Sequence, residues 1–257
     1  MRGKKASTML FVTVMGFSYF ERMIKESNNQ KPALIISTLS AFLTPFMVSA
    51  INVALPSLGK EFGLDAISLS WVATSYILAA AIFLIPFGRL ADIQGRKKIF
   101  IYGVSLFTIF SFLIVTSNSG TMLIALRALQ GMSSAMIFGT SMAILISVTP
   151  PTKRGRVLGI NVAAVYLGLS VGPFLGGLLT QHFGWRSIFY VNVILGIVII
   201  VLTIWKLKGE WAEAKGDKFD FAGSIFFSLT LLLLMYGSSK LPHAAGIYTV
   251  IGSAIFL

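Results

Sequence analysis

Three polar side chains share one face of a strongly apolar stretch of this chain, and one of them is charged. Arg127, Gln130 and Ser134 lie at offsets of three and seven within residues 121–148, so they fall on the same side of a helix. An arginine within a membrane span is costly unless it faces water or a partner group. This pattern is therefore typical of a helix that lines a cavity. The alternative is that Arg127 lies near one end of its span and extends its charge to the membrane surface.

A dense group of charges separates two apolar runs at residues 86–100, "PFGRLADIQGRKKIF". Asp92 follows Arg89 by about one helical turn, so we expect these two side chains to pair. We expect the basic residues that follow to lie at anionic lipid headgroups. A membrane-surface anchor would explain the lysines, but it would not explain two glycines and an aspartate at fixed offsets. The residues that define this loop are Gly88, Arg89, Asp92, Gly95, Arg96 and Lys97.

Small residues recur at helical spacing within residues 157–180, where they would let another helix approach the backbone closely. Pro173 removes one backbone hydrogen bond and can bend the helix. The segment is defined by Asn161, Gly168, Gly172, Pro173, Gly176 and Gly177.

The first long apolar run, residues 33–55, also carries a polar stripe, and Pro45 is expected to bend it. These side chains could line the path of a solute, or they could form hydrogen bonds between helices. Both interpretations stay open at this point. The stripe comprises Ser37, Ser40, Thr44 and Asn52.

Apolar runs long enough to cross a bilayer must position all of these residues. The chain of 257 residues is 56% hydrophobic and only 12% charged, whereas soluble domains carry about 25% charged residues. A span needs about 20 apolar residues. The composition thus predicts an all-α polytopic membrane protein. Its spans are expected at residues 33–55, 70–90, 99–117, 121–148, 157–180, 187–206 and 221–240.

The predicted domains follow from these runs. Residues 1–32 form a cytoplasmic or interfacial segment, and residues 33–206 a bundle of six helices. A cytoplasmic linker, residues 207–220, leads to a seventh span and the beginning of an eighth in residues 221–257. The start resembles a signal peptide, but we favour an interfacial helix or an extension upstream of a start at Met23. Because the last run is still apolar at its final residue, we expect the chain to be truncated.

The placement of basic residues predicts the orientation in the membrane. Seventeen Lys and Arg residues lie in the N-terminal segment and the even-numbered connections, against three in the odd-numbered connections. Cytoplasmic loops carry the excess of Lys and Arg. We therefore expect a multi-pass protein of the cell membrane with a cytoplasmic N-terminus. The same distribution argues against nucleic-acid binding, because the basic residues do not line one polar face.

The motifs together resemble those of the major facilitator superfamily. "GRLADIQGRKK" (88–98) is similar to its loop between helices two and three, "IALRALQGMSSA" (124–135) to its fourth-helix motif, and "GLSVGPFLGG" (168–177) to its antiporter motif. "NVALP" (52–56) and "FGWRSIFYVN" (183–192) resemble its fourteen-helix drug:proton antiporters. The resemblance implies that this chain is the N-terminal part of a transporter whose C-terminal half is missing here.

The resemblance also implies roles for the residues named above. Arg127 would take part in substrate or proton coupling. The glycine face around Gly172 would form a sliding contact between the two halves of the transporter. Asp92 and Arg89 would form a conformational latch, which means a contact made in one state and broken in the other.

One departure from the family pattern concerns the coupling ion. Many fourteen-helix antiporters carry an aspartate where this chain has Met47, and none of its nine acidic residues lies in the middle of a predicted span. A proton relay usually requires such a carboxylate or a histidine. Proton coupling could therefore depend on the missing half, or on Asp92 together with Arg127.

The combined hypothesis is a secondary transporter that exports amphipathic compounds by alternating access. Since no nucleotide-binding loop of the GxxxxGK[ST] type is present, an ion gradient would supply the energy, and the resemblance implies a gradient of protons. The alternatives are transport of a polar metabolite by the same fold, and a membrane sensor or scaffold. The chain has no cysteine, and we expect no enzymatic activity, no metal site and no cofactor. The expected partners are lipid and a small-molecule substrate.

Overall fold

Helices make up the architecture of the computed structural model, which describes residues 2–239 and 244–253, with side chains described from Asn29 onward except at 236, 238–239 and 244–247. Because no strand occurs within these ranges, the all-α prediction is confirmed. A short 3-10 helix, Pro151–Lys153, precedes α5. The α-helices are α1 (Arg2–Phe62), α2 (Ala66–Gln94), α3 (Arg96–Val115), α4 (Gly120–Ser147), α5 (Arg154–Phe183), α6 (Arg186–Lys206), α7 (Phe221–Ser239) and α8 (Ala244–Ser253).

Six of the described helices are long and apolar enough to cross a membrane, as predicted for the bundle. The first of these spans lies within α1, which is continuous through residue 32, so the boundary between the N-terminal segment and the bundle stays a prediction. Pro32 lies inside the helix. Asn29 is also held in place, because its side-chain amide donates to the carbonyl of Lys208 and its oxygen accepts from the Lys208 N–H.

The predicted seventh and eighth spans correspond to α7 and α8. The apolar part of α7 with described side chains, Phe221–Met235, is shorter than a full span. The predicted end of the seventh span at residue 240 and the last residues of the eighth, 254–257, lie outside the described residues.

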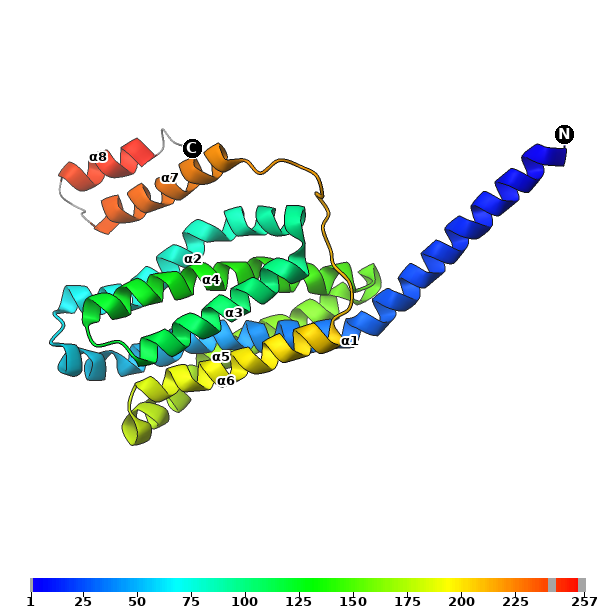
Figure 1. Cartoon of the computed structure of the whole chain (residues 1–257). Helices are drawn as coiled ribbons and strands as arrows, with labels where there is room; N and C mark the ends of the chain where they lie inside the picture. The colour runs from blue at the N-terminus through cyan, green and yellow to red at the C-terminus, as the bar shows by residue number, and fades with distance from the viewer. Residues whose placement is uncertain (1, 240–243, 254–257) are drawn as a thin grey trace.

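The helices pair so that the polar turns gather at two ends of the bundle. In Figure 1, α2 lies along α4, α3 lies between α4 and α6, and α1 packs on α5. The α2–α3 turn, the α4–α5 turn and residues 207–220 lie at one end, which we name the linker end; we name the opposite end the far end. Four aromatic side chains are fully buried between the helices: Phe46, Phe100, Phe107 and Phe189.

Helix α7 stands apart from the six-helix bundle. It lies beside α2 and contacts α8, with which it forms a hairpin on the α2 side of the molecule (Figure 1). Residues 207–220, which we call the linker, run from the end of α6 along the linker end of the bundle to the start of α7. The linker therefore passes directly over the α2–α3 turn.

Candidate functional site

Arg127 lies at the centre of a polar network inside the six-helix bundle. Its side chain is fully buried, and its Nε donates to the carbonyl of Val72 in α2 at 3.1 Å. Its Nη1 donates to Gln130 Oε1 at 2.6 Å, and Gln130 Nε2 donates to Ser111 Oγ in α3 at 2.7 Å. The guanidinium also lies 4.4 Å from the centre of the Tyr76 ring, within the range of a cation–π contact. This network connects α2, α3 and α4.

The structure brings together two of the three residues predicted for this face. Arg127 and Gln130 bond to each other, but Ser134 donates to the carbonyl of Gly131 in its own helix at 2.8 Å. The alternative in which Arg127 extends to the membrane surface is wrong, because the side chain is enclosed between helices. Ser111 and Tyr76 could not be found from the pattern, since they lie on other helices.

The charge of Arg127 has no carboxylate partner among the described residues. Its hydrogen bonds go to a carbonyl and an amide oxygen, and its Nη2 has no hydrogen-bond partner in the part of the chain that the structure describes. A buried cation without a counter-charge is costly. The arrangement is thus one that stability alone does not favour.

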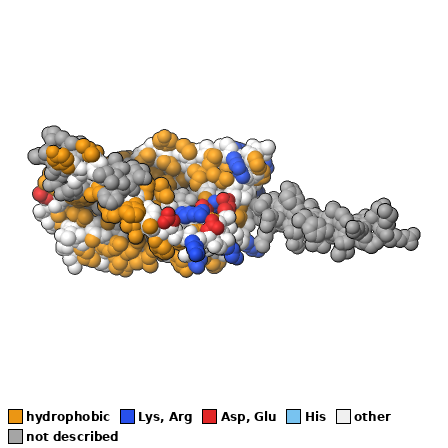
Figure 2. All heavy atoms as spheres, turned by 90° about the horizontal axis from the view of Figure 1, so that it is seen from above, with side chains coloured by type: hydrophobic (Ala, Val, Ile, Leu, Met, Phe, Trp, Pro, Cys, Tyr) orange, Lys and Arg blue, Asp and Glu red, His pale blue; other side chains and the backbone are white. Residues whose placement is uncertain are grey.

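The second polar group of the candidate site lies at the linker end and centres on Arg96. Its guanidinium lies 2.8 Å from Asp92 Oδ1, and it also donates to Ser147 Oγ at 2.8 Å and to Glu213 Oε1 at 2.7 Å. Only 10% of this side chain is exposed. These four residues, which we call the loop cluster, come from α2, α3, α4 and the linker. Figure 2 shows acidic and basic side chains gathered at one place on this face.

The linker bonds to the α2–α3 turn through its backbone and its acidic side chains. The Glu210 carboxylate accepts from the backbone N–H groups of Lys97 and Lys98, at 2.7 and 3.1 Å, and so binds the N-terminal end of α3. Negative charge is stabilised at that position of a helix. The Arg96 N–H donates to the carbonyl of Trp211 at 2.8 Å. The linker is therefore fixed to the loop that the sequence singled out.

The turn itself requires a glycine. Gly95 has a φ of 117°, which L-residues with a side chain rarely adopt. A Cβ at this position would also lie 2.6 Å from the carboxylate carbon of Glu210. Gly95 thus permits the tight reversal between α2 and α3. A Cβ added at Gly88 would meet nothing within 4 Å, although the Gly88 backbone lies next to Gly139 of α4.

The expected pairing of Asp92 with Arg89 is wrong for this structure. Arg89 pairs with Asp217 of the linker at 2.9 Å, and Asp92 pairs with Arg96, four residues further along the chain. The expectation that Arg96 lies at lipid headgroups is also wrong, because its side chain is buried. The linker explains both differences, because its acidic residues lie next to the turn. Asp217 pairs with Arg89, and Glu213 pairs with Arg96. The signal available in the sequence was the presence of Glu210, Glu213 and Asp217 within an otherwise basic connection.

The glycine face of α5 packs directly on α1 of the same bundle. Asn161, Gly168, Gly172 and Gly176 are all buried, as the spacing predicted. A Cβ added to any of the three glycines would lie 2.6 to 2.8 Å from atoms of α1. The three glycines are therefore occupied by α1 in this structure, and the contact between two halves of a transporter, implied by resemblance, stays a prediction. The other side of α5, which includes Pro173 and Phe174, is the exposed one.

Valine at Gly172 should destabilise the bundle. Its Cβ would lie 2.6 Å from the Cβ of Ser49, which cannot move without the backbone of α1. Overpacking of this kind costs about 1–3 kcal/mol. We expect a lower thermal unfolding temperature for the purified full-length protein in detergent.

Gly177 offers a matched control for this substitution on the same helix. A Cβ at Gly177 would have a Val53 methyl as its nearest neighbour, at 3.5 Å, which is an ordinary van der Waals contact. Gly177→Val should leave the unfolding temperature nearly unchanged. Equal effects of the two substitutions would show that α1 and α5 do not pack this closely.

The polar stripe of α1 is mostly satisfied within the protein. Ser40 donates to the carbonyl of Ile36 at 2.8 Å and Thr44 to that of Ser40 at 3.4 Å, both within α1. Asn161 donates to Ser37 between α5 and α1. Asn52 is the exposed member of the stripe. The structure thus favours helix packing for Ser37, Ser40 and Thr44, and it leaves only Asn52 available to a solute.

Met47, at the position where an aspartate was considered, is fully buried. Its sulfur lies 2.6 Å from the side-chain nitrogen of Asn192 in α6. The position is therefore part of the packing between α1 and α6. Glu61 lies in the last turn of α1, at the far end of the bundle. It pairs with Arg186 at 2.7 Å and accepts from the Trp185 indole N–H.

Comparison with known proteins places these features among membrane transporters. Residues 37–257 match the sequence model of the family described as the Major Facilitator Superfamily. The fold resembles the crystal structure of the human organic anion transporter MFSD10 (TETRAN), with a TM-score of 0.61 and 17% identity, over 84% of this chain and 57% of that one. At this identity the structural similarity concerns the fold alone.

Three relatives show the level of sequence similarity. The multidrug resistance protein Stp of Mycobacterium tuberculosis is 35% identical over 84% of this chain and 40% of its own length. The riboflavin transporter RibZ of Clostridioides difficile is 32% identical over 80% of this chain and 46% of its own length. The cephamycin export protein CmcT of Amycolatopsis lactamdurans is 36% identical over 89% of this chain and 47% of its own length. The chain thus spans less than half the length of these three relatives.

Proposed function

Because this chain belongs to the major facilitator superfamily, we propose that it is part of a secondary transporter that exports amphipathic small molecules, including drugs, as an antiporter. The observation that carries this proposal is its identity of 35–36%, over 84–89% of the chain, to proteins named for multidrug resistance and cephamycin export. A further relative, from Streptomyces glaucescens, is named a tetracenomycin C resistance and export protein. The whole transporter would include a further set of helices that complete the substrate path.

The loop cluster is the part of the described structure best suited to respond to a change of state. It joins α2, α3, α4 and the linker through charged side chains at one end of the bundle. Rocking of one bundle against another requires contacts at the ends of helices that form in one state and break in the other. We assign that role to Asp92 and Arg96, in place of Asp92 and Arg89.

Proton coupling is the energy source that we propose for this transporter. The described spans have no carboxylate in contact with Arg127, so the proton-binding group has to lie away from that arginine. Two sources fit: the Asp92 carboxylate at the linker end, or an acidic residue in the part of the transporter outside this chain. A pH gradient that fails to drive export would exclude both.

The linker end is proposed to face the cytoplasm, from the excess of basic residues there. Single cysteines test this, since the 257 residues contain none. Gln94 and Thr152 are exposed at the linker end, and Asn118 is exposed at the far end. In whole cells, a membrane-impermeant maleimide should label Asn118→Cys but not Gln94→Cys or Thr152→Cys. The reverse pattern would invert the orientation, and labelling of all three after permeabilisation is the control for accessibility.

Transport by the full-length protein tests the function directly. Purified protein in liposomes should move a fluorescent amphipathic dye only when a pH gradient is imposed, and a protonophore should abolish the movement. An unchanged rate with the protonophore would remove proton coupling. No movement of any amphipathic compound would favour the sensor or scaffold alternative.

Transport of a polar metabolite is the second candidate, and one observation favours it. The relative from Clostridioides difficile, 32% identical over 80% of this chain, is named a riboflavin transporter. The same liposomes, loaded with a radiolabelled flavin in place of the dye, separate the two candidates. Flavin movement without dye movement would support the second.

A further inference from the structure

The aromatic ring of Tyr76 in α2 lies over the buried guanidinium of Arg127 in α4. The centre of the ring is 4.4 Å from the Arg127 Cζ atom, and only 3% of the tyrosine is exposed. The attraction between a cation and the face of a ring is electrostatic, and it strengthens when both groups are removed from water. The two side chains therefore meet in surroundings that favour their attraction.

The ring supplies negative potential to a cation that lacks a carboxylate partner among the described residues. The Nε and Nη1 groups of Arg127 donate to neutral oxygens of Val72 and Gln130. Its Nη2 has no hydrogen-bond partner in the described part of the chain. The faces of aromatic rings carry partial negative charge, and a buried charge is costly without compensation. The Tyr76 ring is thus a source of electrostatic compensation for this arginine.

Gly131 of α4 lets the backbone of α2 approach at the level of Tyr76. It follows Arg127 by four residues, so the two lie on the same face of α4. A Cβ at Gly131 would overlap the carbonyl oxygen of Tyr76 and lie 2.8 Å from its carbonyl carbon. Backbone atoms cannot rotate away as a side chain can. The glycine therefore permits the helix spacing at which the ring and the guanidinium meet.

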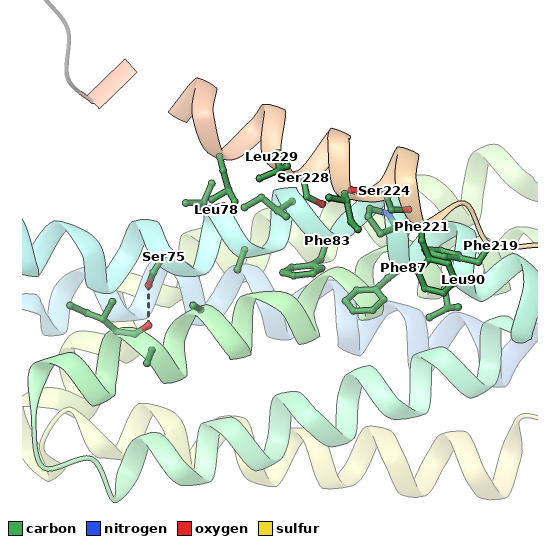
Figure 3. Close-up of a pocket in the computed structure, with 18 of the residues that line it drawn as sticks. Ser75, Leu78, Phe83, Phe87, Leu90, Phe219, Phe221, Ser224, Ser228 and Leu229 are labelled. Carbon is green, nitrogen blue, oxygen red and sulfur yellow. Dashed lines mark hydrogen bonds between the residues drawn. The ribbon is translucent and has the colours of Figure 1, made fainter. Parts of the chain in front are cut away.

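Neighbouring contacts fix α2 against α4 at the same level. Val72 and Tyr76 are four residues apart on α2, so one face of this helix presents both the carbonyl that accepts from Arg127 and the ring. Ser75 donates to the carbonyl of Ile124 in α4 at 3.4 Å, the contact dashed in Figure 3. A movement of α2 along α4 would therefore change the carbonyl contact and the ring contact together.

We propose that Tyr76 is a positioning residue for Arg127, whose ring offsets the buried charge and holds the guanidinium against α2. The ring carries the role, because the Tyr76 hydroxyl has no hydrogen-bond partner among the described residues. The effect on transport rests on the proposed export function and on the part expected of Arg127 in it. The contact itself does not rest on that function, and stability measures it separately.

Replacement of the side chain separates the ring from the hydroxyl in the full-length protein. Tyr76→Phe keeps the ring and should transport within about twofold of the unaltered protein, whereas Tyr76→Leu should lower transport at least about tenfold. Gly131→Ala should lower it as well, because the added methyl group forces α2 away. Gly139→Ala, on the same helix, is the matched control, since its Cβ would lie 3.6 Å from its nearest neighbour, the Cα of Gly88.

Fluorination of the ring tests the cation–π contact itself. Phenylalanine carrying one, two or three fluorine atoms is incorporated in place of Tyr76, which weakens the negative face of the ring stepwise with little change in size. We expect the unfolding temperature in detergent and the transport rate in liposomes to fall along the series. In the Arg127→Met protein, the same series should leave the unfolding temperature unchanged. The series at Phe112, on the exposed side of α3, is the control and should change neither readout.

Three results would overturn the proposal. An unfolding temperature that is independent of fluorine number, or that falls equally in the Arg127→Met protein, would show that the ring only fills space. Equal losses of transport in Tyr76→Phe and Tyr76→Leu would move the role to the hydroxyl. A stepwise fall in stability with an unchanged transport rate would mean that the contact stabilises the fold without positioning the arginine for export. Failure of the export function itself gives a different result, because the unaltered protein would then move no compound while the unfolding series still measures the contact.

Discussion

Replacing Arg127 with methionine should lower transport by the full-length protein at least about tenfold, a change that corresponds to about 1.4 kcal/mol, without lowering its stability. The side chain is fully buried and has no carboxylate partner among the described residues. Methionine has a similar length and removes the charge. It relieves a desolvation penalty of several kcal/mol, while the loss of the donors to Val72 and Gln130 costs about 1–3 kcal/mol for each group left unpaired. The two terms have opposite signs and similar size, so the net change in stability should be small.

The measurement pairs thermal unfolding in detergent with transport in liposomes on the same preparations. Arg127→Lys separates charge from geometry, because it keeps the cation but loses the fork that donates to both Val72 and Gln130. We expect it to recover only part of the transport. Arg156→Met, at an exposed position, is the matched control and should resemble the unaltered protein. An Arg127→Met protein that is both less stable and inactive would show that the arginine serves the fold.

Most of the fold could be predicted from the sequence because it follows from local patterns. The apolar runs have the length of a span, and the basic turns between them mark their ends. The burial of Asn161 and Gly168 followed from helical spacing alone. The boundary at residue 32 was drawn from the apolar run alone, and the helix continues through Pro32, so helical structure does not mark where the first span begins.

The partners within the candidate site could not be predicted in the same way. Spacing identifies which residues share a face, so Arg127 and Gln130 were found together. It does not identify what lies opposite, so Tyr76 and Ser111 were missed. Arg96 was assigned to the membrane surface because its position in a basic run resembled a headgroup anchor. Its real environment depends on a linker more than a hundred residues away in sequence, which brings Glu213 to the turn.

Removing the Asp92–Arg96 contact should change transport more than removing any other charge of the turn. Hydrogen bonds to charged groups contribute about 1.5–3 kcal/mol, and this pair is the most enclosed, with side chains 10% and 32% exposed. An equilibrium between two states would shift about 10- to 100-fold on losing that energy from one of them. Asp92→Asn and Arg96→Gln should therefore each reduce transport about tenfold or more. The Glu213 side chain is 70% exposed, so Glu213→Gln should have a much smaller effect, in line with surface ion pairs.

A double-mutant cycle distinguishes a shared contact from two separate roles. If Asp92 and Arg96 act through their mutual contact, the Asp92→Asn/Arg96→Gln protein should be no worse than either single variant. Substrate affinity, measured on the same purified proteins, should stay within about threefold of the unaltered protein, because a ligand shifts such an equilibrium only through its different affinity for the two states. Lys98→Gln, at an exposed position of the same turn, is the control and should transport normally. Fully additive losses would refute the latch, and so would a loss of binding equal to the loss of transport. In either case the turn would act on the substrate site or on folding, instead of on the balance between states.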